Sequence, residues 1–218
     1  MHDISAIATL DRNNGLARNG ERIHFSPKEE KHLLKILAGN LAIIGKNTFD
    51  EYRRYSKFGI RFIIVSESAT KDPAYNRKYD TFKTLKEALA YAYHNYDSKE
   101  IVICGGERLY KEAFKYVNKL YITHLDITDN HADRHFPLIE AKGWCVRNVG
   151  EWKADGNVRS NRVIYNRRYN VNPRGDLGNV GITNKRVSRK RSFAKLIQDL
   201  KDEKPNISIE DAFKKSNK

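Results

Sequence analysis

Short apolar runs alternate with amphipathic segments along roughly the first 170 residues of the chain. The apolar runs are rich in Ile and Val and have the length of strands; they are residues 4–10, 41–44, 61–65, 101–104 and 120–123. The segments with helical spacing are residues 30–37, 48–55, 84–93 and 108–117. Continuous apolar strands that alternate with helices predict a single α/β domain, with a mostly parallel twisted sheet and helices on both faces.

The pattern changes near the end of this region. Two strand-like segments, residues 146–152 and 159–167, flank the sequence Asp155-Gly156-Asn157, which is typical of a tight turn. They predict an antiparallel hairpin at the edge of the sheet.

A second change in composition occurs near residue 171. Residues 172–218 open with a turn-rich stretch, continue with the basic run 185–191, and end in two short segments with amphipathic helical spacing. We therefore expect a domain at residues 1–171 and a basic tail at residues 172–218. The tail has 12 Lys and Arg against 6 Asp and Glu, so it carries a large part of the net charge of +14.

The basic run has two interpretations. It is suited to an acidic partner, a nucleic acid or an anionic membrane surface, and it is equally typical of a solvated charge cluster on a disordered segment. Few aromatic residues accompany it, so recognition of single strands has little support.

Several classes of protein are disfavoured. No apolar run approaches the ~20 residues of a membrane span, and the N-terminus lacks the layout of a secretory signal, so we expect a cytoplasmic protein. The two cysteines, Cys104 and Cys145, cannot form a disulfide scaffold. The seven histidines show no metal-ligand spacing, and no metal site is expected.

Two strand-to-helix corners contain glycine followed by a cation. Residues 43–48 end a strand at Gly45, add Lys46 and offer Thr48 as a helix N-cap, and residues 103–108 pair two glycines with Arg108. Free backbone amides and a nearby cation favour an anion such as a dinucleotide phosphate. The alternative is that each glycine only makes a tight turn, and neither corner matches the Gly-x-Gly-x-x-Gly fingerprint.

One acidic residue, Glu29, also has two interpretations. Ser26 is suited to an N-cap, Pro27 to the first helical position, and Glu29 to the third position of a capping box. Alternatively, Glu29 is a carboxylate in an apolar cleft that binds a polar ligand by charge-assisted hydrogen bonds.

Taken together, the segments from residue 3 to residue 168 resemble the dihydrofolate reductase family in one colinear order. The matching segments are residues 4–8 (Ile-Ser-Ala-Ile-Ala), 11–20, Pro27-Lys28-Glu29, 43–48 (Ile-Ile-Gly-Lys-Asn-Thr), 62–66, 103–110 with its paired glycines, 119–124 (Lys-Leu-Tyr-Ile-Thr-His) and 132–137. The resemblance implies the fold of that family and NADPH-dependent reduction of 7,8-dihydrofolate to tetrahydrofolate, a step of one-carbon metabolism. We expect a monomer.

The resemblance also implies roles for individual residues. Glu29 and Thr123 would be catalytic, and the substrate would be bound by Ile7, Ala8, Glu29, Leu33, Arg61 and Thr123. NADPH would be bound by Thr9, Leu16, Ala17, Gly45, Lys46, Asn47, Thr48, Ser66, Gly105, Gly106, Glu107, Arg108 and Leu109. The Gly105–Gly106 peptide would be cis, and residues 16–24 would close over the cofactor.

The chain departs from the family pattern at several positions. Arg22-Ile23-His24 replaces the usual Leu-Pro-Trp, Glu30 stands where an apolar residue is usual, and Glu67 lies near the expected adenosine phosphate. Arg61 is one residue away from the family's substrate-binding arginine, and one residue on a strand reverses the face. Two other functions therefore stay open: a related reductase, such as the pyrimidine reductase of riboflavin synthesis, and a structural or nucleic-acid-associated protein with a basic tail.

Overall fold

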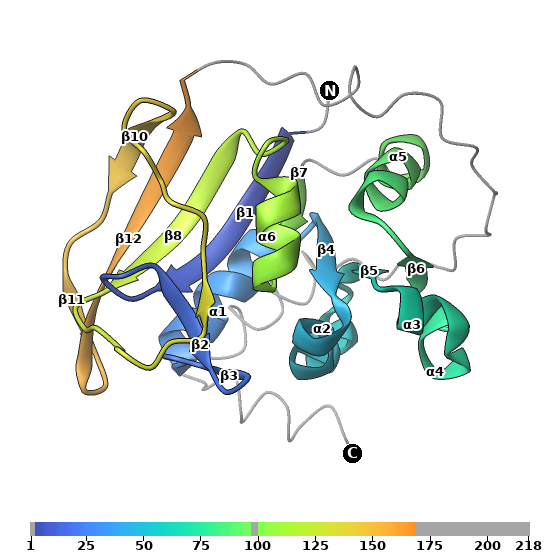
Figure 1. Cartoon of the computed structure of the whole chain (residues 1–218), viewed down its shortest axis with the longest axis horizontal. Coiled ribbons are helices and arrows are strands. Elements are labelled where there is room, and N and C mark those ends of the chain that lie inside the picture. Colours follow the sequence, from blue (N-terminus) through green and yellow to red (C-terminus); the bar gives the residue numbers. More distant parts are fainter. Residues whose placement is uncertain (1–2, 97–99, 169–218) are drawn as a thin grey trace, which may run out of the picture.

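A mixed sheet runs through the molecule in the computed structural model, which describes residues 3–96 and 100–168 (Figure 1). The predicted tail, 172–218, lies outside these described residues. Within them, nine strands form this sheet: β1 (Asp3–Leu10), β4 (Leu41–Gly45), β5 (Arg61–Val65), β6 (Asp80–Phe82), β7 (Glu100–Ile103), β8 (Lys119–Leu125), β10 (Trp144–Val149), β11 (Lys153–Asp155) and β12 (Val158–Arg167).

The strand order is β10-β12-β8-β1-β7-β4-β5-β6, with β11 paired to β12. Pairings from β8 through β6 are parallel, whereas β12 pairs antiparallel with β8, β10 and β11. The predicted α/β architecture with an antiparallel edge is therefore confirmed.

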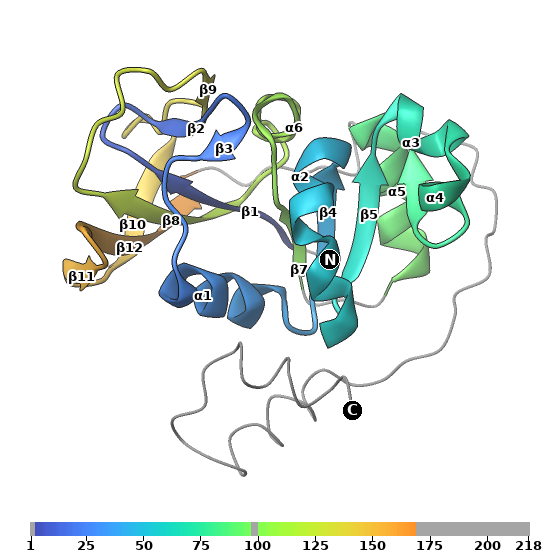
Figure 2. The ribbon, with the colours of Figure 1, turned by 90° about the horizontal axis from the view of Figure 1, so that it is seen from below.

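Helices cover both faces of the sheet (Figure 2). The helical elements are α1 (Pro27–Leu37), α2 (Lys46–Tyr52), the 3-10 helix η1 (Arg53–Phe58), α3 (Glu67–Lys71), α4 (Pro73–Asn76), α5 (Leu85–Asn95) and α6 (Glu107–Ala113). One hydrophobic cluster packs α1, α2 and η1 against the sheet, and a second packs α5 and α6 against the opposite face.

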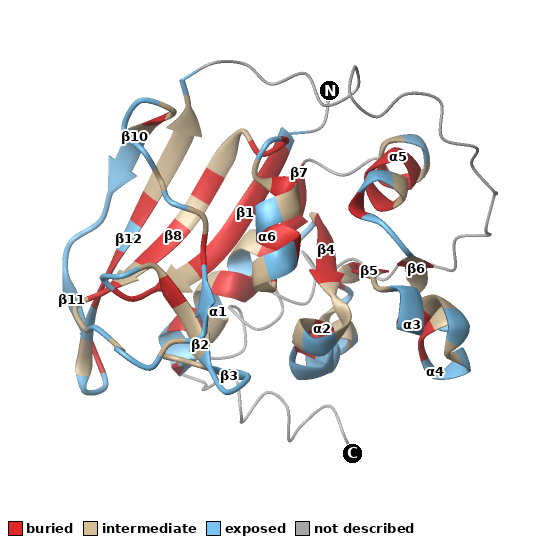
Figure 3. Ribbon diagram, in the orientation of Figure 1, coloured by how far each residue is buried: buried red, intermediate tan, exposed pale blue. Residues whose placement is uncertain are grey.

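The alternation of side chains along β1 shows how the sequence produces these two clusters. Ile4, Ala6, Ala8 and Leu10 lie in the cluster with α5 and α6, whereas Ile7 lies in the cluster with α1. Successive residues of a strand point to opposite faces, so a strand between two helical layers is apolar at nearly every position. The central strands are accordingly buried almost throughout (Figure 3).

Several local predictions were wrong in their boundaries. The helix predicted at residues 48–55 starts at Lys46, so Thr48 lies inside α2 and is not its N-cap; the cap residue is Gly45. This helix ends at Tyr52 and continues as η1, and α6 ends at Ala113 rather than at residue 117. The tight turn at Gly156 joins the short strand β11 to β12, whereas the segment predicted at residues 146–152 corresponds to β10, which pairs with a later part of β12.

A small three-stranded sheet within the described residues was not predicted. It consists of β2 (Gly15–Arg18), β3 (Glu21–Arg22) and β9 (Arg134–His135). Strands of two to four residues are too short to show an alternating pattern. This sheet matters for the site because it holds the segment that leads from β1 to α1.

None of the helices in the described part of the chain has the length and apolar character that a bilayer span requires.

Candidate functional site

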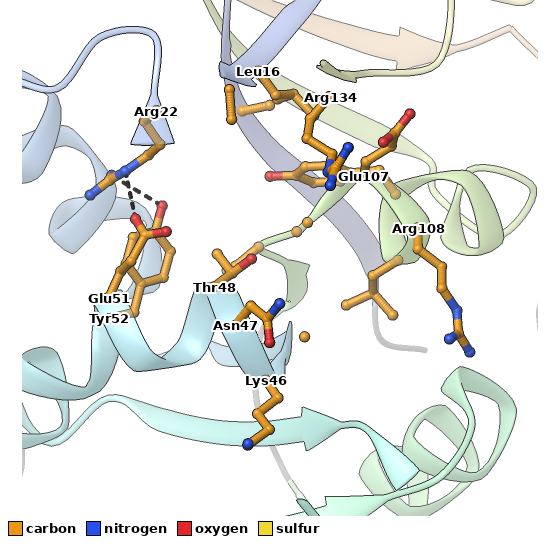
Figure 4. Close-up of a pocket in the computed structure, with 18 of the residues that line it drawn as sticks. Leu16, Arg22, Lys46, Asn47, Thr48, Glu51, Tyr52, Glu107, Arg108 and Arg134 are labelled. Carbon is orange, nitrogen blue, oxygen red and sulfur yellow. Dashed lines mark hydrogen bonds and ion pairs between the residues drawn. The ribbon is translucent and has the colours of Figure 1, made fainter. Parts of the chain in front are cut away.

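A cavity of about 870 Å³ lies at the carboxyl ends of β1 and β4, between α1, α2, α6 and the β2–β3 segment (Figure 4). This is the edge at which parallel sheets bind ligands. The cavity is lined by every residue that the sequence proposed for a site except Arg61 and Thr123; the lining residues among them are Ile7, Ala8, Thr9, Leu16, Ala17, Glu29, Leu33, Gly45, Lys46, Asn47, Thr48, Ser66, Gly105, Gly106, Glu107, Arg108 and Leu109.

At one end of the cavity, the carboxylate of Glu29 is buried and held by two side chains. Glu29 is only 6% exposed. Thr9 Oγ1 donates a hydrogen bond of 3.1 Å to Oε2, and Arg162 Nη2 donates one of 2.8 Å to Oε1. We call Thr9, Glu29, His32 and Arg162 the acid end of the cavity.

The local sequence explains why Glu29 is at this place but not where its carboxylate points. Ser26 caps α1 as predicted, and its Oγ accepts a hydrogen bond of 3.2 Å from the backbone N–H of Glu29. The Glu29 carboxylate is directed to Thr9 and Arg162, away from the Ser26 backbone that a capping box would require. The interpretation of Glu29 as a carboxylate facing a cleft therefore fits the structure better than the capping interpretation.

Thr123 lies behind the cavity wall, in the strand between Thr9 and Arg162. Its Cα is in register with Thr9 of β1 on one side and with Arg162 of β12 on the other. Thr123 is 2% exposed. Partners in register point to the same face of a sheet, so these three residues form one row below α1.

His32 follows Glu29 by one helical turn and also lines the cavity. Burial lowers the pKa of His32 to about 4, and the nearby charge of Arg162 acts in the same direction. His32 is therefore neutral near pH 7. The sequence analysis did not single it out, although its spacing from Glu29 was a signal for a shared helix face.

The two glycine corners meet at the opposite end of the cavity. The backbone N–H of Gly45 donates a hydrogen bond of 2.7 Å to the carbonyl of Gly105, and the Gly105–Gly106 peptide is cis, as expected. A Cβ on Gly106 would lie 3.2 Å from Thr48 Oγ1, and one on Gly45 would lie 3.4 Å from Gly105 O. The two corners thus pack closely on each other and on Thr48, and both line the cavity.

Each corner is followed by a positively charged residue at the start of a helix. Lys46 starts α2, and Arg108 lies in the first turn of α6 (Figure 4). Lys46 lies 4.9 Å from the centre of the Tyr75 ring, and Arg108 pairs with Glu112 at 3.0 Å. The side chain of Arg108 is 86% exposed. We call Gly45, Lys46, Gly105, Gly106 and Arg108 the glycine-corner end.

An ion pair spans the cavity between the β2–β3 segment and α2. Arg22 Nε lies 3.0 Å from Glu51 Oε2, and its guanidinium lies 4.0 Å from the centre of the Phe25 ring (Figure 4). Arg22 also donates a hydrogen bond of 3.5 Å to the Tyr52 hydroxyl. These contacts tie the segment that follows β2 to the opposite wall.

The same segment is anchored on its other side by the β11–β12 hairpin. Asp155 Oδ2 accepts a hydrogen bond of 2.6 Å from Ser26 Oγ and lies 3.1 Å from His24 Nε2. Burial disfavours the charged form of Asp155, but the hydrogen bonds from Ser26 and His24 outweigh it and lower its pKa. His24, which replaces a tryptophan in the pattern that the sequence resembles, thus makes a polar contact with Asp155.

The structure does not bring Arg61 to the cavity. Its guanidinium lies 5.3 Å from the centre of the Tyr96 ring, and Tyr96 belongs to the cluster on the α5 face. The residue before Arg61, Ile60, packs instead in the cluster on the α1 face, together with the cavity-lining Leu33. Successive residues of a strand point to opposite faces of the sheet, so a shift of one residue places Arg61 on the α5 face, away from the cavity.

Glu30 does not line the cavity either. Its Oε1 accepts hydrogen bonds of 2.7 Å from the Tyr55 hydroxyl and 2.8 Å from Arg54. The unusual carboxylate at this position is thus paired with η1 rather than available to a ligand.

Cys104 lines the cavity but is unsuited to nucleophilic chemistry. It is 2% exposed, and burial raises the pKa of its thiol. A thiol that stays protonated is a poor nucleophile.

Comparison with known proteins agrees with this geometry. A family model described as Dihydrofolate reductase matches residues 3–168. Dihydrofolate reductase type 3 of Salmonella typhimurium is 30% identical over 65% of this chain and 82% of its own length. The dihydrofolate reductase of Buchnera aphidicola subsp. Acyrthosiphon pisum is 27% identical over 62% of this chain and 79% of its own length.

A further relative matches beyond the reductase region. Segregation and condensation protein A of Mycoplasmoides gallisepticum is 23% identical over 98% of this chain, which is 36% of that protein. The family match over residues 3–168 covers most of the chain and coincides with the sheet, the cavity and Glu29. The chain therefore belongs to the dihydrofolate reductase family.

Proposed function

We propose that the chain reduces 7,8-dihydrofolate to 5,6,7,8-tetrahydrofolate by hydride transfer from NADPH. The observation that carries this proposal is a buried carboxylate, Glu29, in the same cavity as two glycine corners with cations, in a chain of the dihydrofolate reductase family. A pterin presents an amino group and a ring N–H side by side, and the two oxygens of one carboxylate match this pair.

The cofactor is suited to the glycine-corner end. Gly45 and Gly106 line the cavity, and Lys46 and Arg108 supply positive charge for phosphates. When bound, NADPH supplies the hydride that reduces the carbon of the substrate's C–N double bond. The selection of NADPH over NADH would come from Lys46 and Arg108, because the extra phosphate adds negative charge.

The protein's own contribution would be orientation and exclusion of water. Glu29 would hold the pterin through charge-assisted hydrogen bonds, and Ile7, Ala8 and Leu33 would supply apolar walls. The ion pair between Arg22 and Glu51 would keep the β2–β3 segment over the ligands. The negative charge of Glu29 would favour the pterin protonated at the ring nitrogen that accompanies the reduced carbon.

The test is an absorbance assay that follows NADPH oxidation in the presence of dihydrofolate. We expect turnover that requires both compounds and that falls strongly when NADH replaces NADPH. Binding of NADPH without turnover of dihydrofolate would favour another heterocycle, such as the substrate of the pyrimidine reductase of riboflavin synthesis. Neither binding nor turnover would contradict the proposal and favour a non-catalytic role.

A second role is favoured by one observation, the similarity to Segregation and condensation protein A. That similarity covers 98% of the chain, whereas the reductase match ends at residue 168, so it includes much of the predicted tail. We propose that residues 172–218 bind a nucleic acid or an acidic partner, beside a domain at residues 1–171.

This second proposal can be tested in the full chain with the basic run made neutral. Replacing Lys185, Arg186, Arg189, Lys190 and Arg191 by Gln should weaken binding to duplex DNA and reduce its dependence on salt, because fewer phosphates are neutralised. Reductase turnover should not change. Unchanged DNA binding, or loss of folding of residues 1–171 when the tail is removed, would contradict the proposal.

A further inference from the structure

The carboxylate of Glu29 is fixed from outside its own helix. Arg162 Nη2 donates a hydrogen bond of 2.8 Å to Oε1 of Glu29 and one of 2.9 Å to the backbone carbonyl of Lys28. It therefore bridges two successive residues in the first turn of α1. Thr9 Oγ1 fixes the other oxygen, Oε2, at 3.1 Å. Both oxygens therefore have a protein partner before any ligand is present.

The sheet explains why Arg162 reaches this carboxylate. Arg162 lies on β12 in register with Thr123 of β8, which is itself in register with Thr9 of β1. The row crosses the sheet below α1 and ends at Arg162, whose side chain is 41% exposed while that of Glu29 is 7% exposed. Arg162 thus approaches from the solvent side, and the cavity side of the carboxylate remains open.

The remaining acceptor capacity of Glu29 suits a ligand with two adjacent donors. An ionised carboxylate offers about four lone-pair sites, and Arg162 and Thr9 occupy one on each oxygen. One site on each oxygen remains. Because both oxygens are fixed, the plane of the carboxylate is fixed as well, which is the condition for a bidentate contact of defined direction.

The other charged groups nearby do not replace Arg162. His32 is the titratable neighbour on α1, and it is itself faced by Arg162, Glu29 and Lys35. Since burial and Arg162 lower its pKa to about 4, it carries no charge near pH 7. The ammonium group of Lys28 donates a hydrogen bond of 2.7 Å to the carbonyl of Ala154 on the β11–β12 hairpin, so it is directed to the hairpin.

We infer that Arg162 is a positioning residue: it orients and electrostatically supports the Glu29 carboxylate that receives the substrate's paired N–H donors. The inference deepens the proposed function and rests on it where activity is concerned. No local pattern around residue 162 indicates this role, because the partner lies more than a hundred residues earlier in the chain.

The experiment compares three full-length variants. Arg162→Met removes the charge, Arg162→Lys keeps it without the forked donors, and Arg159→Met removes an equal charge from the same strand. Arg159 is a matched control because it is 61% exposed and lies 3.8 Å from Asp126, away from the cavity lining.

We expect Arg162→Met to lower kcat/KM for dihydrofolate between about ten- and a hundredfold, as for loss of a hydrogen bond to a charged group. Arg162→Lys should restore part of the loss, because the charge returns without the forked donors, and Arg159→Met should keep the wild-type kcat/KM. Wild-type kcat/KM in Arg162→Met would overturn the inference.

A second readout does not depend on turnover. NMR titration of the His32 ring, assigned with His32→Gln, should show a low pKa in the wild type and an upward shift in Arg162→Met, because a nearby positive charge is lost while Glu29 remains. Arg159→Met should leave the titration unchanged. If the wild-type chain does not reduce dihydrofolate, the proposed function fails; if His32 titrates identically in Arg162→Met, the placement of Arg162 at Glu29 fails.

Discussion

The charged side chains at the two ends of the cavity differ in their burial and in their partners. At the acid end, Glu29 is buried and both of its oxygens have partners, and the neighbouring His32 is neutral near pH 7. At the glycine-corner end, Arg108 is 86% exposed and pairs with Glu112, one helical turn away. The carboxylate at one end is held by side chains from two strands, whereas the other end presents a half-buried Lys46 and an exposed Arg108 on long side chains.

The difference follows from what each end has to bind. A buried charge without partners is costly, so the acid that faces a pterin must be supported by the protein. Phosphates are already charged and solvated, and exposed cations gain most of their interaction energy only when the phosphate is bound. The comparison therefore predicts large, geometry-dependent effects at the acid end and moderate, charge-dependent effects at the glycine-corner end.

The largest effect is expected from Glu29→Gln, compared with Glu30→Gln. Glu29 lines the cavity, and its amide replacement loses the charge that favours a protonated pterin, so kcat/KM should fall by at least about a hundredfold. Glu30 is paired with Arg54 and Tyr55 outside the cavity lining, and its replacement should cost about tenfold or less. Steady-state kinetics with dihydrofolate measures both.

Equal losses in these two variants, or the reverse order, would show that the acid has been assigned to the wrong residue. Affinity for NADPH, measured by titration without substrate, should be the same in both variants and in the wild type.

A smaller effect is expected when the cations of the glycine-corner end are removed one at a time. Lys46→Ala and Arg108→Ala should each raise KM for NADPH about tenfold and leave KM for NADH nearly unchanged, because only NADPH carries the additional phosphate. Lys111→Ala is the control: Lys111 lies on α6 but pairs with Glu107 and does not line the cavity. Parallel losses for both cofactors would mean that these cations do not select the phosphate.

The smallest effect concerns stability at acid pH. The pKa of His32 is about 4 in the folded chain and about 6.5 in an unfolded one, so the unfolded chain binds more protons between these values. The folded state is therefore destabilised as pH falls from about 6.5 to about 4. After discounting for the partial exposure of His32, the loss is about 1 kcal/mol.

His32→Gln should remove this component of the pH dependence. Urea denaturation at several pH values between about 4 and 7 measures the free energy of unfolding, and His131→Gln, at an exposed position, provides the control. An identical pH slope in the wild type and in His32→Gln would contradict the assignment.

The strands and the main helices follow from patterns that any short window of the sequence contains. The apolar runs of β1, β4, β5, β7 and β8 and the spacing in α1 and α5 were sufficient to predict them. The small sheet of β2, β3 and β9 was not predictable in this way, because its strands are too short to show a pattern and β9 joins β2 from more than a hundred residues away.

The residues of the site can be divided in the same way, into those that a local pattern indicates and those that only the fold places. Gly45, Gly105 and Gly106 are recognisable from sequence because a corner at the end of a strand is a local event, and Ser26 capped α1 as expected. Arg61 illustrates the limit: its residue type suits a carboxylate, but its position on β5 directs it to Tyr96 on the other face.

By itself, the sequence determined the order of strands and helices, the place of Glu29 in the first turn of α1 and the two glycine corners. The tertiary structure decided which groups surround Glu29, because Thr9, Thr123 and Arg162 become neighbours only when β1, β8 and β12 pair in register. Hydrophobic periodicity acts over a few residues, whereas the support of a buried charge comes from whichever strands the fold brings beside it.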